Sequence, residues 1–298
     1  MPEGSFAGRP LPAADRTNEQ LHLRLARANE KRFAPALPTA EWKRDIEETA
    51  AFLHEEGEFL EAFRASVADR AAEAPTDADG FVAWFEALEQ DGPGQNDPLF
   101  PWLAEEATMD EMRWFLTQEV AGEAGFEDLS ALTQVKLPQR PKLEIARNYW
   151  DEMGRGNPKG MHGPMLELLS ERLGLEPRVE TTVWEALALA NTMAGLAANR
   201  RYAYHSVGAL GVIEQTAPGR AALVAQGLKR LGVPAGDRHY FDLHAILDVK
   251  HSEAWNAEAL HPLVASNPAF APAIAEGALM RLECGAACFR RYRRELGL

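Results

Sequence analysis

Apolar residues along this chain recur at the three- and four-residue spacing of helices over most of its length. The clearest example is EMRWFLTQEVAGEAGFEDLSALTQV, which runs from Glu111 to Val135. Thr108 and Glu111 stand at its start in the arrangement of a capping box. Alternating runs of β-branched residues, which would indicate strands, are nearly absent. The pattern therefore predicts an all-α protein.

Further helices are predicted where similar patterns lie between turn-forming residues. They cover residues 16–33, 37–63, 142–153, 161–175, 183–215, 221–232, 238–260 and 268–296. Thr17 and Gln20 form a second candidate capping box. Alanine and glycine are frequent in 183–215, which would let neighbouring helices approach closely, and Pro218 is expected to follow the end of that helix.

Composition and charge exclude several classes of function. The 298 residues carry a net charge of −14, and such an acidic surface repels phosphate backbones and anionic lipids. Neither nucleic acid nor a membrane is therefore an expected partner. No apolar stretch reaches the roughly 18 residues of a membrane span, and the N-terminal sequence lacks the apolar core of a signal peptide. A cytoplasmic location is expected, and the two cysteines, Cys284 and Cys288, suit neither a disulfide framework nor a thiolate zinc site.

The segment FDLHAILDVKH, residues 241–251, places two histidines and an aspartate on one side of a helix. His244, Asp248 and His251 stand at i, i+4 and i+7, within about 60° of one another around the helix axis. A buried aspartate between two imidazoles needs compensation, which a divalent metal ion would supply. A hydrogen-bonded cluster is the alternative, and zinc would accept the same side chains, so the motif alone does not choose the metal.

Further ligands are expected on other buried helices. Glu119 and Glu123 lie one turn apart among apolar residues and share a helix face. Glu152 ends a helix, and His162 follows ten residues later, after the loop GRGNPKG. Glu214 lies at the end of an apolar run. Bundles with several inward carboxylates and histidines hold pairs of oxygen-activating metal ions, and a ligand set without thiolate favours iron or manganese over a structural zinc.

Four segments carry a resemblance to a known family. QEVAGEAGF, NYWDEMGRGNPKGMH, GVIEQTAP and HAILDVKH resemble, in this order, the haem-oxygenase-like dimetal oxidases and oxygenases, which are also called iron-containing redox enzymes. The resemblance covers about residues 108–255 and implies a haem-oxygenase-like seven-helix bundle that forms a homodimer. A single such domain is then expected over residues 19–298, with an N-terminal helical extension, after a flexible segment over residues 1–18.

The resemblance also implies roles for the candidate ligands. The family's last core helix carries His-x3-Asp-x2-His, which His244, Asp248 and His251 match. Glu214 matches a glutamate about thirty residues upstream, and His162 matches the histidine after a glycine-containing turn.

Two further ligand positions come from the first and second core helices of the family. One glutamate is expected from the first, and Glu119 and Glu123 are both candidates for it. Glu152, ten residues before His162, matches an additional carboxylate found in the branch that oxygenates nitrogen. The resemblance therefore implies seven ligands for two iron ions per chain, with Glu152 also a catalytic residue.

The function implied is that of a non-haem diiron monooxygenase. Such an enzyme would activate O2 and N-oxygenate the amine of an amino acid or related small molecule, to the hydroxylamine, nitroso or nitro level, in natural-product biosynthesis. The chain has no flavin or nicotinamide fingerprint, so an external electron donor is expected. Candidate contacts for a substrate carboxylate are Arg147, Arg155, Arg201 and His205.

Three alternatives remain open. The same dimetal site could perform desaturation or oxidative carbon–carbon cleavage of an amino or fatty acid. The chain could bind haem through His22, or it could be a non-enzymatic helical scaffold whose polar residues form a hydrogen-bond network. A phosphate-binding role for GRGNPKG is not favoured, because a phosphate loop follows a strand and NYWDEM is predicted to be helical.

Overall fold

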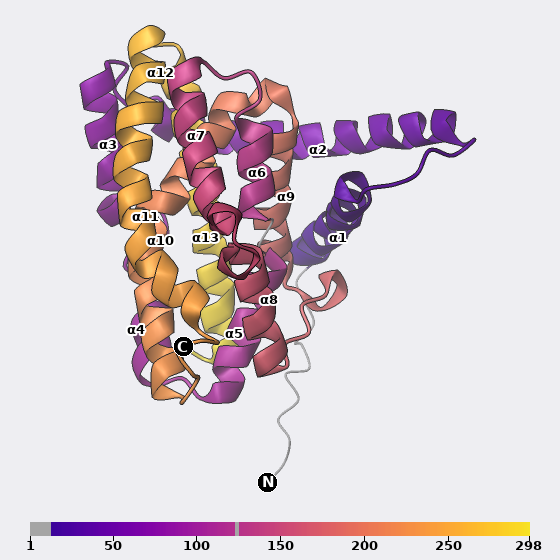
Figure 1. Ribbon diagram of the computed structural model, residues 1–298. Helices are drawn as coiled ribbons and strands as arrows, with labels where there is room; N and C mark the ends of the chain where they lie inside the picture. The colour runs from indigo at the N-terminus through magenta and orange to yellow at the C-terminus, as the bar shows by residue number, and fades with distance from the viewer. Residues whose placement is uncertain (1–12, 123–124) are drawn as a thin grey trace.

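The computed structural model describes residues 13–122 and 125–298, and the regular structure of these residues is helical (Figure 1). The α-helices are α1 (Ala13–Phe33), α2 (Trp42–Ala71), α3 (Ala78–Asp91), α4 (Leu99–Glu105), α5 (Met109–Gly122), α6 (Phe126–Thr133), α7 (Gln139–Glu152), α8 (His162–Leu173), α9 (Trp184–Ala198), α10 (Ala203–Arg230), α11 (His239–Trp255), α12 (His261–Ser266) and α13 (Phe270–Leu296). Short turns of other helical types are η1 (Gly154–Gly156), η2 (Pro158–Gly160), η3 (Val179–Thr181), η4 (Arg200–Tyr202) and η5 (Asn256–Leu260). The prediction of an all-α protein is confirmed.

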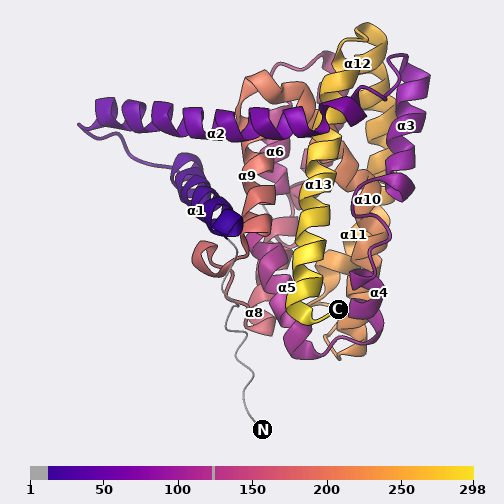
Figure 2. The same ribbon diagram turned by 180° about the vertical axis from the view of Figure 1, so that it is seen from behind.

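Helices α10 and α13 are central to the bundle. Helix α10 packs against α4, α11 and α13, and α13 packs in turn against α2 and α9. Seen from behind, α13 runs beside α9 (Figure 2). The N-terminal half of α2 extends beyond the bundle in both views, with α1 below it (Figures 1 and 2). An N-terminal helical extension is therefore present as α1 and α2.

Two glycines allow α10 and α13 to touch at their backbones. A Cβ on Gly208 would lie 1.9 Å from the carbonyl oxygen of Ile274. A Cβ on Gly277 would lie 1.9 Å from the carbonyl oxygen of His205. These distances are far inside van der Waals contact, so any side chain here would force the helices apart. The close approach expected of the small-residue segment is thus observed.

The structure corrects the helix predicted over residues 183–215. The turn η4 divides it into α9 and α10, and α10 continues through Pro218 to its end at Arg230. Proline has no N–H, so Pro218 removes the helical hydrogen bond to the carbonyl of Glu214. The packing of α10 against neighbouring helices on either side of this position maintains the helix, and the predicted end at Pro218 is wrong.

Helix starts were predicted with mixed success. The Thr108 capping box forms, because the Thr108 N–H donates to the Glu111 carboxylate at 2.8 Å and the Glu111 N–H faces the Thr108 hydroxyl at 3.4 Å. Thr17, in contrast, lies inside α1 rather than at its start. A cap signal in sequence does not identify a helix start when the residues before it can also be helical.

Residues 1–12 and 123–124 lie outside the described residues. Most of the predicted flexible segment 1–18 and the candidate ligand Glu123 therefore cannot be placed, whereas residues 13–18 belong to α1. Among the described helices, none combines the length and apolar character needed to cross a membrane. The single domain over residues 19–298 stays a prediction.

Candidate metal centre

Two groups of three side chains lie close together where α7, α8, α10 and α11 meet. The first triad is Glu152, His162 and His244, and the second triad is Glu214, Asp248 and His251. In each triad, one possible ligand atom from each residue lies within 4.8 Å of the others. The structure thus brings together six of the eight ligands predicted from the sequence. All of these side chains except His251 line one cavity.

The glycine loop joins two ligands of the first triad. Met153 and Met161 form an isolated antiparallel bridge that closes the loop between Glu152 and His162. Gly154 has φ of +59°, and a Cβ there would lie 2.3 Å from the carbonyl carbon of Gly160. This tight base holds His162 Nδ1 2.7 Å from Glu152 Oε2. The loop therefore turns the chain so that the two side chains meet.

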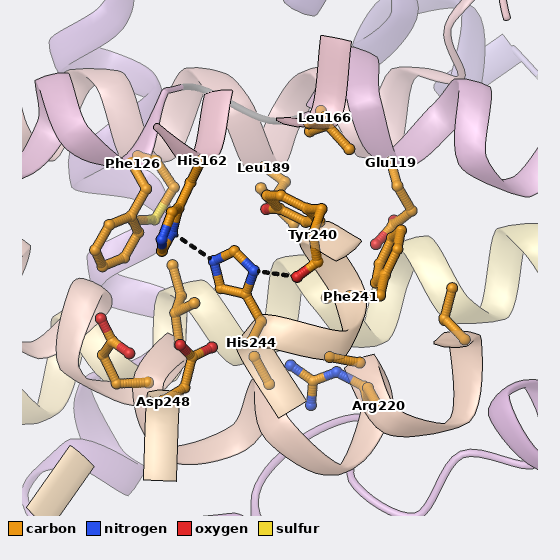
Figure 3. A pocket seen from close by; sticks show the side chains of 18 of the residues that line it. Glu119, Phe126, His162, Leu166, Leu189, Arg220, Tyr240, Phe241, His244 and Asp248 are labelled. Carbon is orange, nitrogen blue, oxygen red and sulfur yellow. Dashed lines mark hydrogen bonds between the residues drawn. The ribbon is translucent and has the colours of Figure 1, made fainter. Parts of the chain in front are cut away.

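The atoms of the first triad are spaced like ligands of one ion. His162 Nδ1 lies 3.1 Å from His244 Nε2, as the dashed line in Figure 3 marks. His244 Nδ1–H donates to the carbonyl of Tyr240 at 2.7 Å, which leaves a lone pair on Nε2. Nitrogen and oxygen ligands lie about 2.1 Å from a metal ion, so adjacent ligands lie about 3 Å apart. The two separations at His162, 2.7 and 3.1 Å, match this value.

Burial prepares the first triad for a metal ion. It lowers the pKa of His244 to about 4, with a further contribution from His162, and it lowers the pKa of His162 itself. Both imidazoles are therefore neutral at pH 7, as metal ligands must be. Burial and the neighbouring Glu214 carboxylate raise the pKa of Glu152 well above its usual range. A cation between these groups would offset the cost of an ionised Glu152.

The second triad is oriented by two side chains that are not in it. His251 Nε2 faces Asp151 Oδ2 at 3.2 Å, and the Asn148 amide donates to Glu214 Oε1 at 2.5 Å. His251 Nδ1 then faces Glu214 at 3.4 Å and Asp248 at 3.9 Å. A carboxylate behind a histidine ligand fixes its tautomer and orientation, which is the usual arrangement around metal-binding imidazoles. Asp151, adjacent to Glu152 in sequence, was not predicted.

The residues present fit a pair of iron ions. His251 Nδ1 is buried and has no well-formed hydrogen bond among the described residues, because its nearest carboxylate oxygen, on Glu214, lies 3.4 Å away. Burial and the carboxylates of Glu214 and Glu152 raise the pKa of Asp248 to about 10, which shows how strongly the site needs positive charge. Carboxylate oxygens and imidazole nitrogens without sulfur are ligands that suit iron or manganese.

Metal loading at pH 7 is expected to release protons. Burial lowers the pKa of His251, but the Glu214 and Asp151 carboxylates outweigh it and raise the value to about 9, while Asp248 titrates at about 10. Both groups hold protons in the metal-free protein and must lose them to bind an ion, so apparent affinity should rise with pH up to these values. A pH-indicator dye in weakly buffered anaerobic solution measures the release, and pH-independent binding would contradict the assignment.

Glu119, one of the two candidates for the first-helix ligand, is not part of either triad. The Glu119 carboxylate accepts a hydrogen bond from the Tyr292 hydroxyl at 2.9 Å, and Glu119 lies on the opposite side of the cavity from His162 (Figure 3). Glu127, at the start of α6, also lines the cavity and was missed in the sequence. Its carboxylate raises the pKa of both Glu152 and His162, which places it beside the first triad.

The cavity has a volume of about 210 Å³ and mostly apolar walls. These walls include Phe115, Phe126, Leu166, Leu189, Ile213 and Phe289. The four side chains predicted to contact a substrate carboxylate are not among the described residues that line it. Instead, Arg147 pairs with Glu144, Arg155 with Asp151, Arg201 with Glu61 and His205 with Glu276. The structure therefore does not support the predicted role of these four residues.

His22, the alternative haem ligand, is packed in the interior away from this cavity. Its ring lies 4.9 Å from that of Phe59 and 5.7 Å from that of Trp184, and the Asn191 amide donates to its carbonyl. Burial lowers the pKa of His22 to about 4. Packing against Phe59 of α2 and Trp184 of α9 gives the buried His22 a structural role between α1, α2 and α9, which disfavours the haem-binding alternative.

A helical bundle that presents two carboxylate–histidine triads to one cavity defines a class of protein that binds metal ions between its helices. The chain belongs to the iron-containing redox enzymes, a haem-oxygenase-like family whose model matches residues 113–286, more than half of the sequence. Membership indicates an oxidoreductase that uses iron.

Similar folds occur among solved structures. A CADD-like protein of unknown function from Nostoc punctiforme is 16% identical, with a TM-score of 0.59 over 73% of this chain and 97% of that chain. At this identity the likeness concerns the fold alone. Among curated proteins, the chain has no match.

Proposed function

We propose that the protein is a non-haem diiron monooxygenase that N-oxygenates the amine of a small molecule such as an amino acid. The observation that carries the proposal is the position of Glu152. This carboxylate belongs to the first triad, 2.7 Å from His162, and does not face solvent. Its place in the sequence, ten residues before His162, matches that of the additional carboxylate that the resemblance associates with nitrogen oxygenation, and this match supports the proposal.

The proposed ligands of the two ions are the six side chains of the triads. Iron bound there would supply O2 activation and electron transfer. The chain itself orients these ligands through the Tyr240 carbonyl on His244, Asp151 on His251 and Asn148 on Glu214. Its apolar walls exclude water from the reaction. The basic amine of a substrate must lose its proton before reaction, and an ionised carboxylate at the cavity can accept it.

The function is tested on protein loaded anaerobically with ferrous iron. The expected result is about two iron ions per chain and, after addition of ¹⁸O2 with a panel of amino acids and amines, a product that carries labelled oxygen on nitrogen. Mass spectrometry of the products provides the measurement, and iron-free protein is the control. Binding of one ion only, or labelled products with oxygen on carbon, would contradict the proposal.

The apolar cavity favours one alternative reaction of the same site. Walls formed by side chains such as Leu166, Ile213 and Phe289 would also accept a hydrocarbon chain. Desaturation or oxidative carbon–carbon cleavage of an amino or fatty acid would leave nitrogen unoxidised or release a fragment. The same product analysis distinguishes these outcomes. A homodimeric state and an external electron donor stay predictions.

A further inference from the structure

Charged side chains line the end of the cavity away from the first triad. They are Arg220 of α10, Arg281 of α13 and Glu119 of α5. In Figure 3, Arg220 and Glu119 lie on one side of the cavity and His162 and Asp248 on the other. The apolar walls lie between these two polar ends. The cavity therefore combines a candidate metal end, an apolar middle and a cationic end.

Among the described residues, Arg220 forms hydrogen bonds with neutral side chains, and the Glu119 carboxylate acts on it through its charge. Its guanidinium donates to Gln95 Oε1 at 3.1 Å and to Thr216 Oγ1 at 3.2 Å. It lies 5.8 Å from the ring centre of Phe100 and 5.6 Å from that of Phe289. Burial, with repulsion from a neighbouring guanidinium, lowers the pKa of Arg220 to about 10, so the side chain remains cationic at pH 7. The aromatic rings stabilise this cation only partly.

Arg281 supplies that neighbouring guanidinium. Its Nε is buried and has no hydrogen-bond partner among the described residues, and its charge acts on the Glu119 carboxylate without an ion pair between them. Gly285, one turn later on α13, leaves space for the guanidinium, since a Cβ there would lie 3.1 Å from Arg281 Nη1. A partly buried cation without an ion pair is costly, and a bound anion would reduce that cost.

The Glu119 carboxylate does not neutralise both guanidinium groups, those of Arg220 and Arg281. Its carboxylate accepts the hydrogen bond from Tyr292, and burial raises its pKa. Even when Glu119 is ionised, the two guanidiniums leave one positive charge. With Glu119 ionised, one monoanion would balance the remaining charge and a phosphate dianion would exceed it; with Glu119 protonated, two positive charges would remain.

We propose that Arg220 and Arg281 bind the carboxylate of a small substrate that has an apolar middle and whose opposite end reaches the two triads. The inference rests on the proposed use of this cavity by a substrate, and it names the substrate class. Guanidinium groups present paired N–H donors that match the two oxygens of a carboxylate. The length of the apolar walls then selects which carbon or nitrogen atom of the substrate lies at the metal ions.

The test measures binding on the full chain loaded with Zn²⁺, which is redox-inert and does not consume the ligand. Straight-chain carboxylates from butanoate to octanoate are compared by calorimetry with the alcohols of equal length and with inorganic phosphate. Carboxylates are expected to bind at least about tenfold more tightly than the matching alcohols. Arg281→Gln should abolish this preference. Arg201→Gln, the same change at an exposed arginine paired with Glu61, should preserve it.

Equal binding of carboxylates and alcohols at every chain length would overturn the inference. A preference for carboxylates that survives in both Arg281→Gln and Arg220→Gln would do so as well. Tighter binding of phosphate than of every carboxylate would also exclude the carboxylate. Circular dichroism shows whether each variant is folded. If Arg220→Gln does not fold, the carboxylate preference of Arg281→Gln alone tests the inference. Because no oxygen chemistry is involved, failure here is distinct from failure of the proposed function.

Discussion

Replacing His244 with glutamine is expected to remove one of the two iron ions proposed for this site. His244 Nε2 lies 3.1 Å from His162 Nδ1, and its lone pair points into the first triad because Nδ1–H is held by the Tyr240 carbonyl. A glutamine side chain cannot place a nitrogen lone pair there, so the ion should bind at least about a hundredfold more weakly. Iron per chain after anaerobic loading and desalting should fall from about two to about one, with loss of turnover.

The matched control for this variant is His54→Gln. His54 is an exposed histidine of α2, outside the cavity, and its replacement should leave both iron content and turnover unchanged. If His244→Gln retained two ions with wild-type affinity, His244 would have to be removed from the ligand set. Circular dichroism of both variants shows whether the helices are intact.

Replacing Gly277 with alanine is expected to destabilise the whole bundle. The new methyl group would lie 1.9 Å from the His205 carbonyl oxygen and 2.6 Å from the His205 Cα. Both contacts are with backbone, which cannot rotate away, so α10 and α13 must separate. The expected loss is about 3 kcal/mol or more in the free energy of unfolding. Urea denaturation of the metal-free protein measures it.

Gly57→Ala is the matched control for the effect of alanine on a helix. Gly57 lies within α2, and a Cβ there meets no atom within 4 Å. Its replacement should stabilise the protein by roughly 0.5 to 1 kcal/mol, because alanine favours the helical backbone. Equal stability of Gly277→Ala and the wild type would mean that the helices do not touch at this glycine.

Much of the fold and part of the site were predictable from local sequence pattern. The i, i+4, i+7 spacing correctly placed His244, Asp248 and His251 on one side of a helix. It did not reveal that the helix divides them, with His244 in the first triad and the other two residues in the second. That division depends on where α8 and α10 meet α11, and a single helix carries no information about its neighbours.

The charged residues of the cavity were harder to identify. Arg147, Arg155 and Arg201 are close in sequence to candidate ligands or helix ends, but their side chains pair with carboxylates elsewhere. Arg220 and Arg281 were missed, because an arginine on a helix is usually exposed. A signal existed, since Arg281 interrupts the apolar run GALMRLECGAACF, which indicates a charged side chain that is partly buried.

The bridge between Met153 and Met161 closes the base of the glycine loop. The distance between Glu152 and His162 therefore does not depend on the length of the loop. Glu152 and His162 are held by the base of that loop, where Gly154 and Gly160 touch, and not by its outer residues. The tip at Asn157–Lys159 is exposed and does not line the cavity. Insertions or grafted peptides at the tip should therefore be tolerated without displacing the pair. This makes the tip a suitable place for a fluorescent label or an affinity tag on an otherwise intact enzyme.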